Sequence, residues 1–249
     1  MPQPVLYTDL ADWFHLLTAP EEYAEEAAFF LATITRALGA APTSLLELGA
    51  GGGNNASHYK HHVPAVTLTD LSPSMLSLSR RINPELEHVT GDMRDLRLGR
   101  VFDAVFAHDA VDYLMTEDDL RRAFATAFVH LRPGGVAVFA PDHLAENFRS
   151  SHSAGGHDGA DGRALRYLEW TREPNPGGAT YSVDFAYLLS EPGKPIRCVH
   201  DRHRHGLFPR ATWLRLLAEA GFEAAHTLPF EHSEVEPDTM ELFVAHRPA

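Results

Sequence analysis

The stretch Leu45-Leu46-Glu47-Leu48-Gly49-Ala50-Gly51-Gly52-Gly53-Asn54-Asn55-Ala56 decides the fold of this chain. The apolar run that ends at Glu47 predicts a buried strand, the glycine cluster predicts a tight turn, and residues 56–60 predict the start of a helix. Glycine suits such a turn because a residue without Cβ can reverse the chain sharply and lie against a ligand. We therefore expect a ligand at this turn.

The spacing of the glycines tests whether the expected ligand is a dinucleotide. Dinucleotide-binding turns carry glycine at the first, third and sixth positions. Here the first and third positions are Gly49 and Gly51, but the sixth is Asn54 and the additional glycine is the fifth, Gly53. The turn departs from the dinucleotide pattern, so the segments that follow it must decide which ligand is expected.

The next segment supplies an acid at a strand tip. The apolar run of residues 65–70 ends in Asp70, whose carboxylate could accept two hydrogen bonds from a ribose diol. Ser72 then predicts a helix N-cap with Pro73 in the first turn, which places Met75 to pack on an adenine ring. This arrangement indicates a nucleoside ligand.

Three further segments continue the alternation of strands and helices. They are residues 89–95, which place Asp92 and Met93 after a short third strand, residues 101–108, which form a fourth strand, and residues 131–139, a Leu-x-Pro-Gly-Gly turn that leads into a fifth strand. Such alternation predicts a parallel sheet with helices on both faces. Helices are expected near residues 21–31, 118–131 and 209–220.

The ordered series from Glu47 to Gly135 resembles the motifs of class I S-adenosylmethionine-dependent methyltransferases, and the resemblance covers about residues 44–140. It implies a three-layer α/β, Rossmann-like core with a mostly parallel seven-stranded sheet, and S-adenosyl-L-methionine as cofactor. The cofactor-binding residues that it implies are Glu47, Gly49, Ala50, Gly51, Gly53, Asp70, Leu71, Met75, Asp92, Met93 and His108. Glu47 could instead be a purely structural strand-end acid, and Asp92 could merely cap the following turn.

The methyl acceptor is expected beyond the fourth strand, over residues 108–113. An amine or hydroxyl acceptor must lose a proton, which a histidine or a carboxylate can take directly or through water. We hypothesise that Asp109 orients or deprotonates the acceptor and that His108 lines the cofactor site. The alternative is that both side chains only hydrogen-bond neighbouring backbone.

We expect a helical cap at 1–43, a cofactor-binding core at 44–140 and 206–249, and an insert at 141–205, which the resemblance implies covers the active site. Residues 150–163, rich in Ser, Gly, His and Asp, predict a mobile loop. Runs at 164–171, 180–189 and 196–204, the first two separated by a turn at 174–178, predict a small antiparallel sheet.

This layout is similar to that of small-molecule methyltransferases that include the deoxysugar N,N-dimethyltransferases. The motif Tyr23-x-x-Glu26-Ala27 resembles their entry helix, which implies that Tyr23 lies near the methionine part of the cofactor. A small-molecule nitrogen or oxygen acceptor is expected, although the layout does not identify it as a sugar.

The insert supplies most of the candidate substrate residues. Alternation along the third run puts His203 and His205 on one face and His200 on the other, which suits a shared metal poorly, so no metal is expected. The substrate candidates are Tyr113, Tyr167, Trp170, Arg202, His203 and His205. The alternatives are a core position for Tyr113 and a solvated strand face for the others.

Composition limits the partners. A formal charge of −13 over 249 residues disfavours nucleic acid and anionic membranes, which select clustered Lys and Arg. The single cysteine, Cys198, excludes an internal disulfide. No apolar run reaches the ~20 residues of a membrane span and no leader is apparent, so a cytoplasmic protein is expected. The sequence assigns no oligomeric state.

Two other classes of protein remain open at this stage. The same motifs would serve a non-catalytic module that binds S-adenosylmethionine or S-adenosylhomocysteine, and only substrate-dependent product release separates this module from an enzyme. A nicotinamide-dependent oxidoreductase is less favoured because of the fifth-position glycine and the Leu-Arg-Pro-Gly-Gly turn. Calorimetry with both cofactors would distinguish it.

Overall fold

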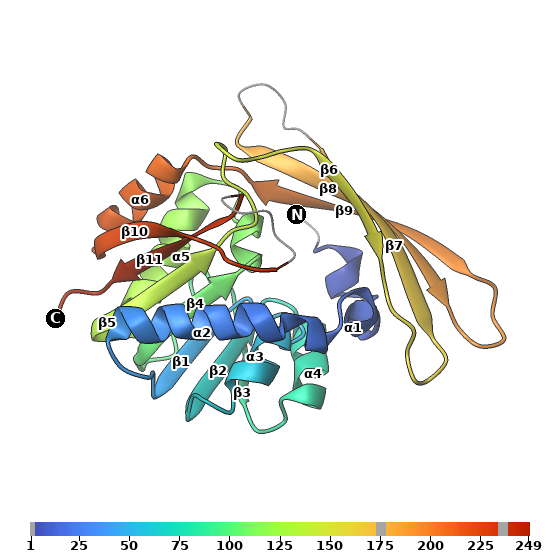
Figure 1. The fold of residues 1–249 in the computed structure, drawn as a ribbon, viewed down its shortest axis with the longest axis horizontal. Coiled ribbons are helices and arrows are strands. Elements are labelled where there is room, and N and C mark those ends of the chain that lie inside the picture. Colours follow the sequence, from blue (N-terminus) through green and yellow to red (C-terminus); the bar gives the residue numbers. More distant parts are fainter. Residues whose placement is uncertain (1–2, 173–177, 234–238) are drawn as a thin grey trace.

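The computed structural model describes residues 3–172, 178–233 and 239–249. One sheet contains seven strands in the order β10-β11-β5-β4-β1-β2-β3 (Figure 1). Its strands are β1 (Ser44–Leu48), β2 (Ala65–Asp70), β3 (Glu87–Thr90), β4 (Phe102–His108), β5 (Leu131–Ala140), β10 (Glu223–Pro229) and β11 (Glu241–His246). The first five run parallel, and β11 is antiparallel to both of its neighbours. The predicted mostly parallel sheet is confirmed.

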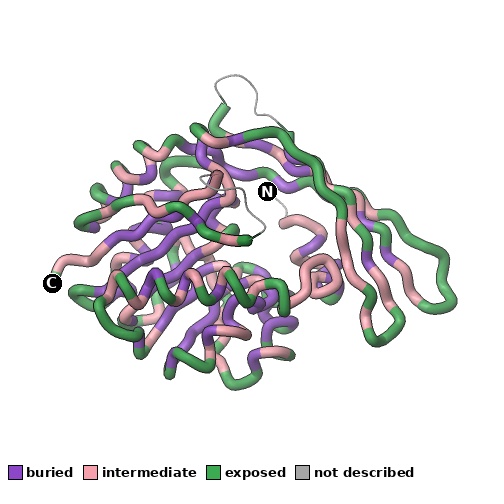
Figure 2. The backbone as a smooth tube through the Cα atoms, viewed as in Figure 1, coloured by how far each residue is buried: buried purple, intermediate pink, exposed green. Residues whose placement is uncertain are grey.

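Helices cover both faces of this sheet and make three layers. On one face α2 (Ala24–Leu38) and α3 (Asn54–Tyr59) pack on the strands, and Phe30 contacts Phe106 of β4. On the other face lie α5 (Glu117–Val129) and α6 (Arg210–Glu219), with Phe124 against Phe139 of β5. The central strands are largely buried, as Figure 2 shows, and their mainly apolar sequences fit burial on both faces.

Two helix starts have side-chain caps, and the predicted cap by Ser72 is confirmed. The Ser72 hydroxyl accepts a hydrogen bond from the Met75 backbone N–H at the start of α4 (Pro73–Ile82). The Thr116 hydroxyl accepts one from the Asp119 N–H at the start of α5. Each cap satisfies one of the backbone donors that a helix leaves unpaired in its first turn.

The insert forms a second, antiparallel sheet in the order β6-β7-β8-β9 (Figure 1). Its strands are β6 (Ser151–Gly155), β7 (Ala164–Arg172), β8 (Thr180–Ser190) and β9 (Arg197–Gly206). The inner face packs on the N-terminal segment, where Leu6 and Trp13 join Leu165, Tyr187 and Leu189 in one cluster. Most of the turn expected at 174–178 lies outside the described residues.

The expectation of a mobile loop over residues 150–163 is wrong in part. Ser151–Gly155 is the edge strand β6, which pairs with β7, so the insert has a fourth strand. Residues 151–154 are all exposed, so no apolar alternation marks the strand. An edge strand built from small and polar residues is a common protection against unwanted pairing.

Short helical turns connect the N-terminus to the sheets. These are η1 (Val5–Tyr7), η2 (Ala11–Trp13), α1 (Phe14–Leu17) and η3 (Pro20–Tyr23), and η3 continues directly into α2. The segment lies between the core and the insert in Figure 1. Among the described residues, none of the helices has the length and apolar character needed to cross a membrane.

Candidate active site

The glycine turn is held by hydrogen bonds from β2. The backbone N–H groups of Gly49 and Ala50 both donate to the Thr69 carbonyl at 2.8 Å, and the Gly51 N–H donates to Oδ2 of Asp70 at 2.8 Å. Oδ1 of Asp70 accepts from the Ser72 N–H at 2.7 Å. Asp70 therefore fixes both the turn and the start of α4, while carboxylate lone pairs remain for a ligand.

Gly49 is required by two independent features. Its φ of +75° lies in the left-handed region, and a Cβ at this position would come 2.2 Å from the Cβ of Ala110. Ala110 begins η4 (Ala110–Tyr113), directly after the fourth strand. The absence of a side chain at Gly49 thus lets the cofactor turn and the expected acceptor segment meet.

A cavity of about 460 Å³ opens above the turn, at the carboxyl ends of the parallel strands. Ligands of open α/β sheets commonly bind in this position. The sequence-predicted residues that line it are Tyr23, Glu47, Gly49, Ala50, Gly51, Asp70, Leu71, Asp92, Met93, His108, Asp109, Tyr113 and Arg202. Segments from the N-terminal cap, from the core and from the insert therefore converge on one space.

Gly53 and Met75 are not part of the cavity wall. Gly53 is the N-cap of α3 with a φ of +77°. Met75 is 1% exposed, and its Cε lies 3.7 Å from the position that a Cβ on Gly51 would occupy. Met75 supports the turn from behind it, and Gly53 connects the turn to α3.

The cavity fits a cofactor that carries an ammonium and a sulfonium group. Glu47, Asp70, Asp92 and Asp109 supply carboxylates to its wall. The side-chain oxygens of Asn54 and Asn55 are buried and have no hydrogen-bond partner among the described residues. The turn has fewer free N–H donors for a ligand carboxylate than its sequence suggests. The N–H groups of Gly49, Ala50 and Gly51 already donate to Thr69 and Asp70.

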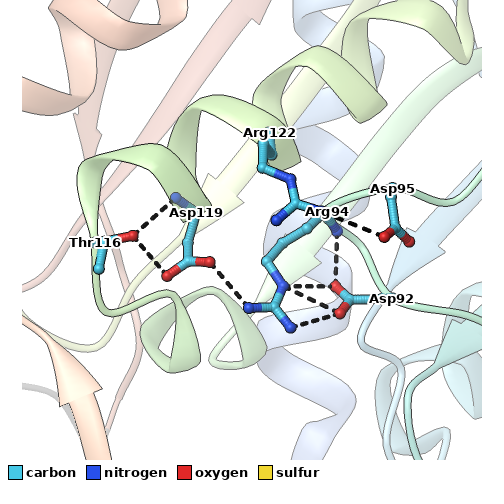
Figure 3. Close-up of polar contacts among 6 residues, drawn as sticks. All are labelled: Asp92, Arg94, Asp95, Thr116, Asp119 and Arg122. Atoms are coloured by element: carbon cyan, nitrogen blue, oxygen red, sulfur yellow. Dashed lines mark hydrogen bonds and ion pairs between the residues drawn. The ribbon is translucent and has the colours of Figure 1, made fainter.

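Asp92 belongs to an ion-pair network that the sequence did not indicate (Figure 3). The Arg94 guanidinium donates to both oxygens of Asp92 and, at 2.9 Å, to Asp119 at the start of α5. The Arg94 backbone N–H also donates to Asp92, so this residue caps the following turn. Although burial opposes it, these bonds hold the pKa of Asp92 below its ordinary value. Asp92 thus caps the turn and also lines the cavity.

Glu47 is a buried acid at the end of β1. It is 4% exposed, and the hydroxyl of Tyr59 on α3 donates a hydrogen bond to it. Burial raises the pKa of Glu47 to about 7, although the Tyr59 hydrogen bond opposes that shift. Because the folded chain holds this proton more tightly than the unfolded chain, stability from Glu47 is lost as the pH rises from about 4.5 to 7.

The substitution Glu47→Gln is expected to remove this pH dependence, because a carboxamide stays neutral. Without cofactor, the free energy of unfolding of the wild type should fall by about 3 kcal/mol more than that of the variant between pH 4.5 and pH 8. Urea denaturation of both proteins at the two pH values measures the difference. An equal decrease of the free energy of unfolding in both proteins would contradict the raised pKa of Glu47.

His108 and Asp109 form an ion pair at the end of β4. Nε2 of His108 lies 2.7 Å from Oδ1 of Asp109, and Nδ1 lies 3.6 Å from Oε1 of Glu26. Burial opposes a charged ring, but the carboxylates of Asp109, Glu26 and Glu47 raise the pKa of His108 to about 9. Burial also opposes a charged Asp109, but the neighbouring His108 lowers the pKa of this carboxyl. At neutral pH the pair is an imidazolium and a carboxylate.

Asp109 has a strained backbone. Its φ of 38° and ψ of −48° are rare for a residue with a side chain, and such strain costs about 1–3 kcal/mol. The Asp109 N–H donates to the Ala140 carbonyl at 3.1 Å, and the Asp109 carbonyl accepts from the Asp112 N–H at 2.9 Å. These bonds hold the half-exposed carboxylate at the cavity wall.

The substrate candidates divide between the two faces of the insert. His203 and His205 are buried on the inner face, whereas the His200 side chain is 64% exposed on the outer face, so the predicted alternation is confirmed. The Tyr113 hydroxyl lies 2.7 Å from Nδ1 of His203. Tyr113 therefore connects the cavity with the inner face of β9.

The expected wall of Tyr167 and Trp170 is not formed. Tyr167 packs with the N-terminal cluster, and Trp170 is 55% exposed on the other side of β7. Neither lines the cavity in the described part of the chain, because residues three apart on a strand point to opposite faces. Arg202 borders the cavity, but its Nε donates to Asp184 at 2.7 Å.

The N-terminal segment supplies cavity residues that sequence patterns did not reveal. Gln3, Pro4, Tyr7 and Phe14 all line it. The Ser72 hydroxyl donates to the Tyr7 carbonyl, which ties this segment to the start of α4. Short 3-10 turns carry no extended hydrophobic period, so only the three-dimensional structure brings these residues to the site.

The fold and this cavity define a class I S-adenosylmethionine-dependent methyltransferase. Residues 45–135 match the family model described as a methyltransferase domain. The chain is 34% identical to the dTDP-3-amino-3,4,6-trideoxy-alpha-D-glucopyranose N,N-dimethyltransferase of Streptomyces venezuelae, over 96% of both chains. It belongs to the methyltransferase family that contains the deoxyaminosugar N,N-dimethyltransferases. The oxidoreductase alternative is therefore wrong, and the chain is an enzyme rather than a binding module.

Solved structures agree with this assignment. Streptomyces venezuelae DesVI superposes with a TM-score of 0.83 at 29% identity, covering 97% of this chain and 99% of that chain. SAM-bound CalS10, an amino pentose methyltransferase from Micromonospora echinaspora, gives a TM-score of 0.74 at 28% identity, covering 90% and 91%. The similarity thus extends over the core and the insert.

Proposed function

We propose that this enzyme methylates the amino nitrogen of a nucleotide-linked deoxyaminosugar, twice in succession. The relatives that resemble it over most of their length are named for such substrates. The observation that carries the choice of nitrogen over oxygen is the His108–Asp109 pair. With the pKa of Asp109 lowered and that of His108 raised to about 9, neither group is a strong base at neutral pH.

A weak base is sufficient for the methylation of an amine but not of a sugar hydroxyl. A neutral amine already has a lone pair for the attack, whereas a hydroxyl has to be deprotonated first. When bound, S-adenosylmethionine supplies a methyl group to the attacking nitrogen and leaves as S-adenosylhomocysteine, and the nitrogen releases one proton. Asp109, directly or through water, is the proposed acceptor of that proton.

The other residues of the cavity have proposed roles in binding. Asp70 is proposed to hold the ribose diol, and Asp92 with the Met93 backbone to frame the adenine. Tyr23 and the Asn54–Asn55 pair face the space expected for the methionine part. The insert is proposed to exclude water from the acceptor, which favours an in-line displacement.

Mass spectrometry of reactions with synthetic sugars tests the proposal. The enzyme should add one and then two methyl groups to a dTDP-3-amino-3,4,6-trideoxyglucose, with one S-adenosylhomocysteine released for each. The matched control is the same sugar with a 3-hydroxyl in place of the amine, which should remain unmodified. Methylation of the hydroxyl sugar, or binding of the amino sugar without any turnover, would contradict the proposal.

A further inference from the structure

A buried chain of hydrogen bonds runs from β9 to the cavity. Oδ2 of Asp201 lies 3.1 Å from Nε2 of His203, and Nδ1 of His203 lies 2.7 Å from the Tyr113 hydroxyl. That hydroxyl lies 2.9 Å from the hydroxyl of Tyr7. The side chains of Asp201 and His203 are 6% and 3% exposed, whereas both tyrosines line the cavity.

The chemistry of the bonded groups fixes which atom donates at the Asp201 end of this series of hydrogen bonds. The Leu6 N–H donates to Oδ2 of Asp201 at 2.9 Å, and a carboxylate can only accept, so Nε2 of His203 must donate to it. Although burial opposes it, these hydrogen bonds hold the pKa of Asp201 below its ordinary value. Asp201 is therefore the negatively charged end of the chain.

The same order of donor and acceptor continues through the two tyrosines. In the proposed direction, Nε2 of His203 carries the ring proton and Nδ1 accepts from the Tyr113 hydroxyl, 2.7 Å away. The Tyr113 oxygen then accepts from the Tyr7 hydroxyl, 2.9 Å away. With its proton directed inwards, the Tyr7 oxygen presents only lone pairs to the cavity.

Tyr7 is placed where these lone pairs can be used. Burial raises the pKa of its phenol, and the negative charges of Asp109 and Asp70 raise it further, so the hydroxyl stays neutral. Asp70 marks the cofactor side of the cavity and Asp109 the acceptor side. Tyr7 therefore offers a neutral hydrogen-bond acceptor to the cavity that both acids line.

We propose that Asp201 and His203 are positioning residues that orient this chain so that the Tyr7 oxygen accepts one N–H of the substrate amine while Asp109 accepts another. The inference rests on the proposed amine acceptor and deepens it. A primary amine whose lone pair points at the methyl group has two N–H bonds to be accepted, but a monomethylated amine has only one. The first transfer thus needs both acceptors and the second needs one.

The substitution Asp201→Leu removes the acceptor that holds the ring proton of His203 on Nε2. Nδ1 can then carry this proton and donate to Tyr113, so that the Tyr7 hydroxyl points its own proton into the cavity. We expect kcat/KM for the primary amine to fall about tenfold, the value of one hydrogen bond, with a much smaller effect on the monomethylated amine. Tyr7→Phe should give the same selective loss.

A double-mutant cycle of these two variants tests the inference. If Asp201 acts through Tyr7, Asp201→Leu has little further effect in the Tyr7→Phe background. S-adenosylmethionine affinity, measured by calorimetry, should be unchanged in all variants. The inference would be overturned if the losses of kcat/KM in the two single variants multiplied in the double variant, or if both amines lost equally. Either result would overturn it even if the wild type dimethylates its substrate. A wild type that methylates neither amine would overturn the proposed function as well.

His203→Asn provides a second route if Asp201→Leu does not fold. It keeps a partner for Tyr113 but removes the contact with Asp201, so the same selective loss for the primary amine is expected. The matched control is His200→Asn, on the same strand and the exposed face. It should leave both rates unchanged, and an equal loss in the control would overturn the positioning role.

Discussion

Replacement of Asp109 by Asn is expected to lower kcat by about 10²-fold or more while the dissociation constant for S-adenosylmethionine changes little. Asparagine keeps the shape but cannot take a proton from the amine, and positioned bases contribute roughly 10²–10⁴-fold. Single-turnover kinetics with the amino sugar measures the first effect, and calorimetry measures the second. Loss of the carboxylate should also lower the pKa of His108, which an NMR titration can follow.

The control for this variant is Asp118→Asn, which changes a 73% exposed acid on α5. It should behave as the wild type in both measurements. If Asp109→Asn retained kcat within a factor of about two, Asp109 would have no part in catalysis, and its strained backbone would need a different explanation.

Replacement of Asp70 by Ala is expected to weaken S-adenosylmethionine binding by about 10- to 150-fold. The carboxylate accepts the Gly51 and Ser72 N–H groups and is placed to receive a ribose, and a hydrogen bond to a charged group contributes about 1.5–3 kcal/mol. Calorimetric titration of the purified chain measures the dissociation constant. Asp70→Asn should lie between the wild type and Asp70→Ala because it keeps one acceptor oxygen.

Asp95→Ala is the matched control for this substitution. Its side chain is 66% exposed and pairs only weakly with Arg122, at 3.3 Å, so cofactor affinity should not change. Unchanged affinity in Asp70→Ala, in a protein that circular dichroism shows to be folded, would remove Asp70 from the cofactor site.

The core was predictable because its strands are local signals. The inner parallel strands β1, β2, β4 and β5 contain short apolar runs that are buried on both faces, so one sequence window identifies each of them. The acids at 47, 70 and 92 therefore fell at the correct edge of the sheet without any knowledge of distant contacts. The capped starts of α4 and α5 were local signals as well.

The parts that were missed depend on distant pairings. β6 is polar on both faces, and only its partner β7 makes it a strand. The contact between Leu6 and Asp201 joins residues 195 positions apart, which no local period reveals. Tyr167 and Trp170 are different, because strict alternation along their strand already forbade a shared wall.

The most direct test of the cofactor assignment is a crystal structure of this chain with S-adenosylhomocysteine. We expect the adenosyl group in the cavity over residues 49–51, with the ribose hydroxyls on Asp70 and the sulfur directed toward the His108–Asp109 pair. An empty cavity at saturating ligand, or a ligand bound elsewhere on the molecule, would contradict the assignment.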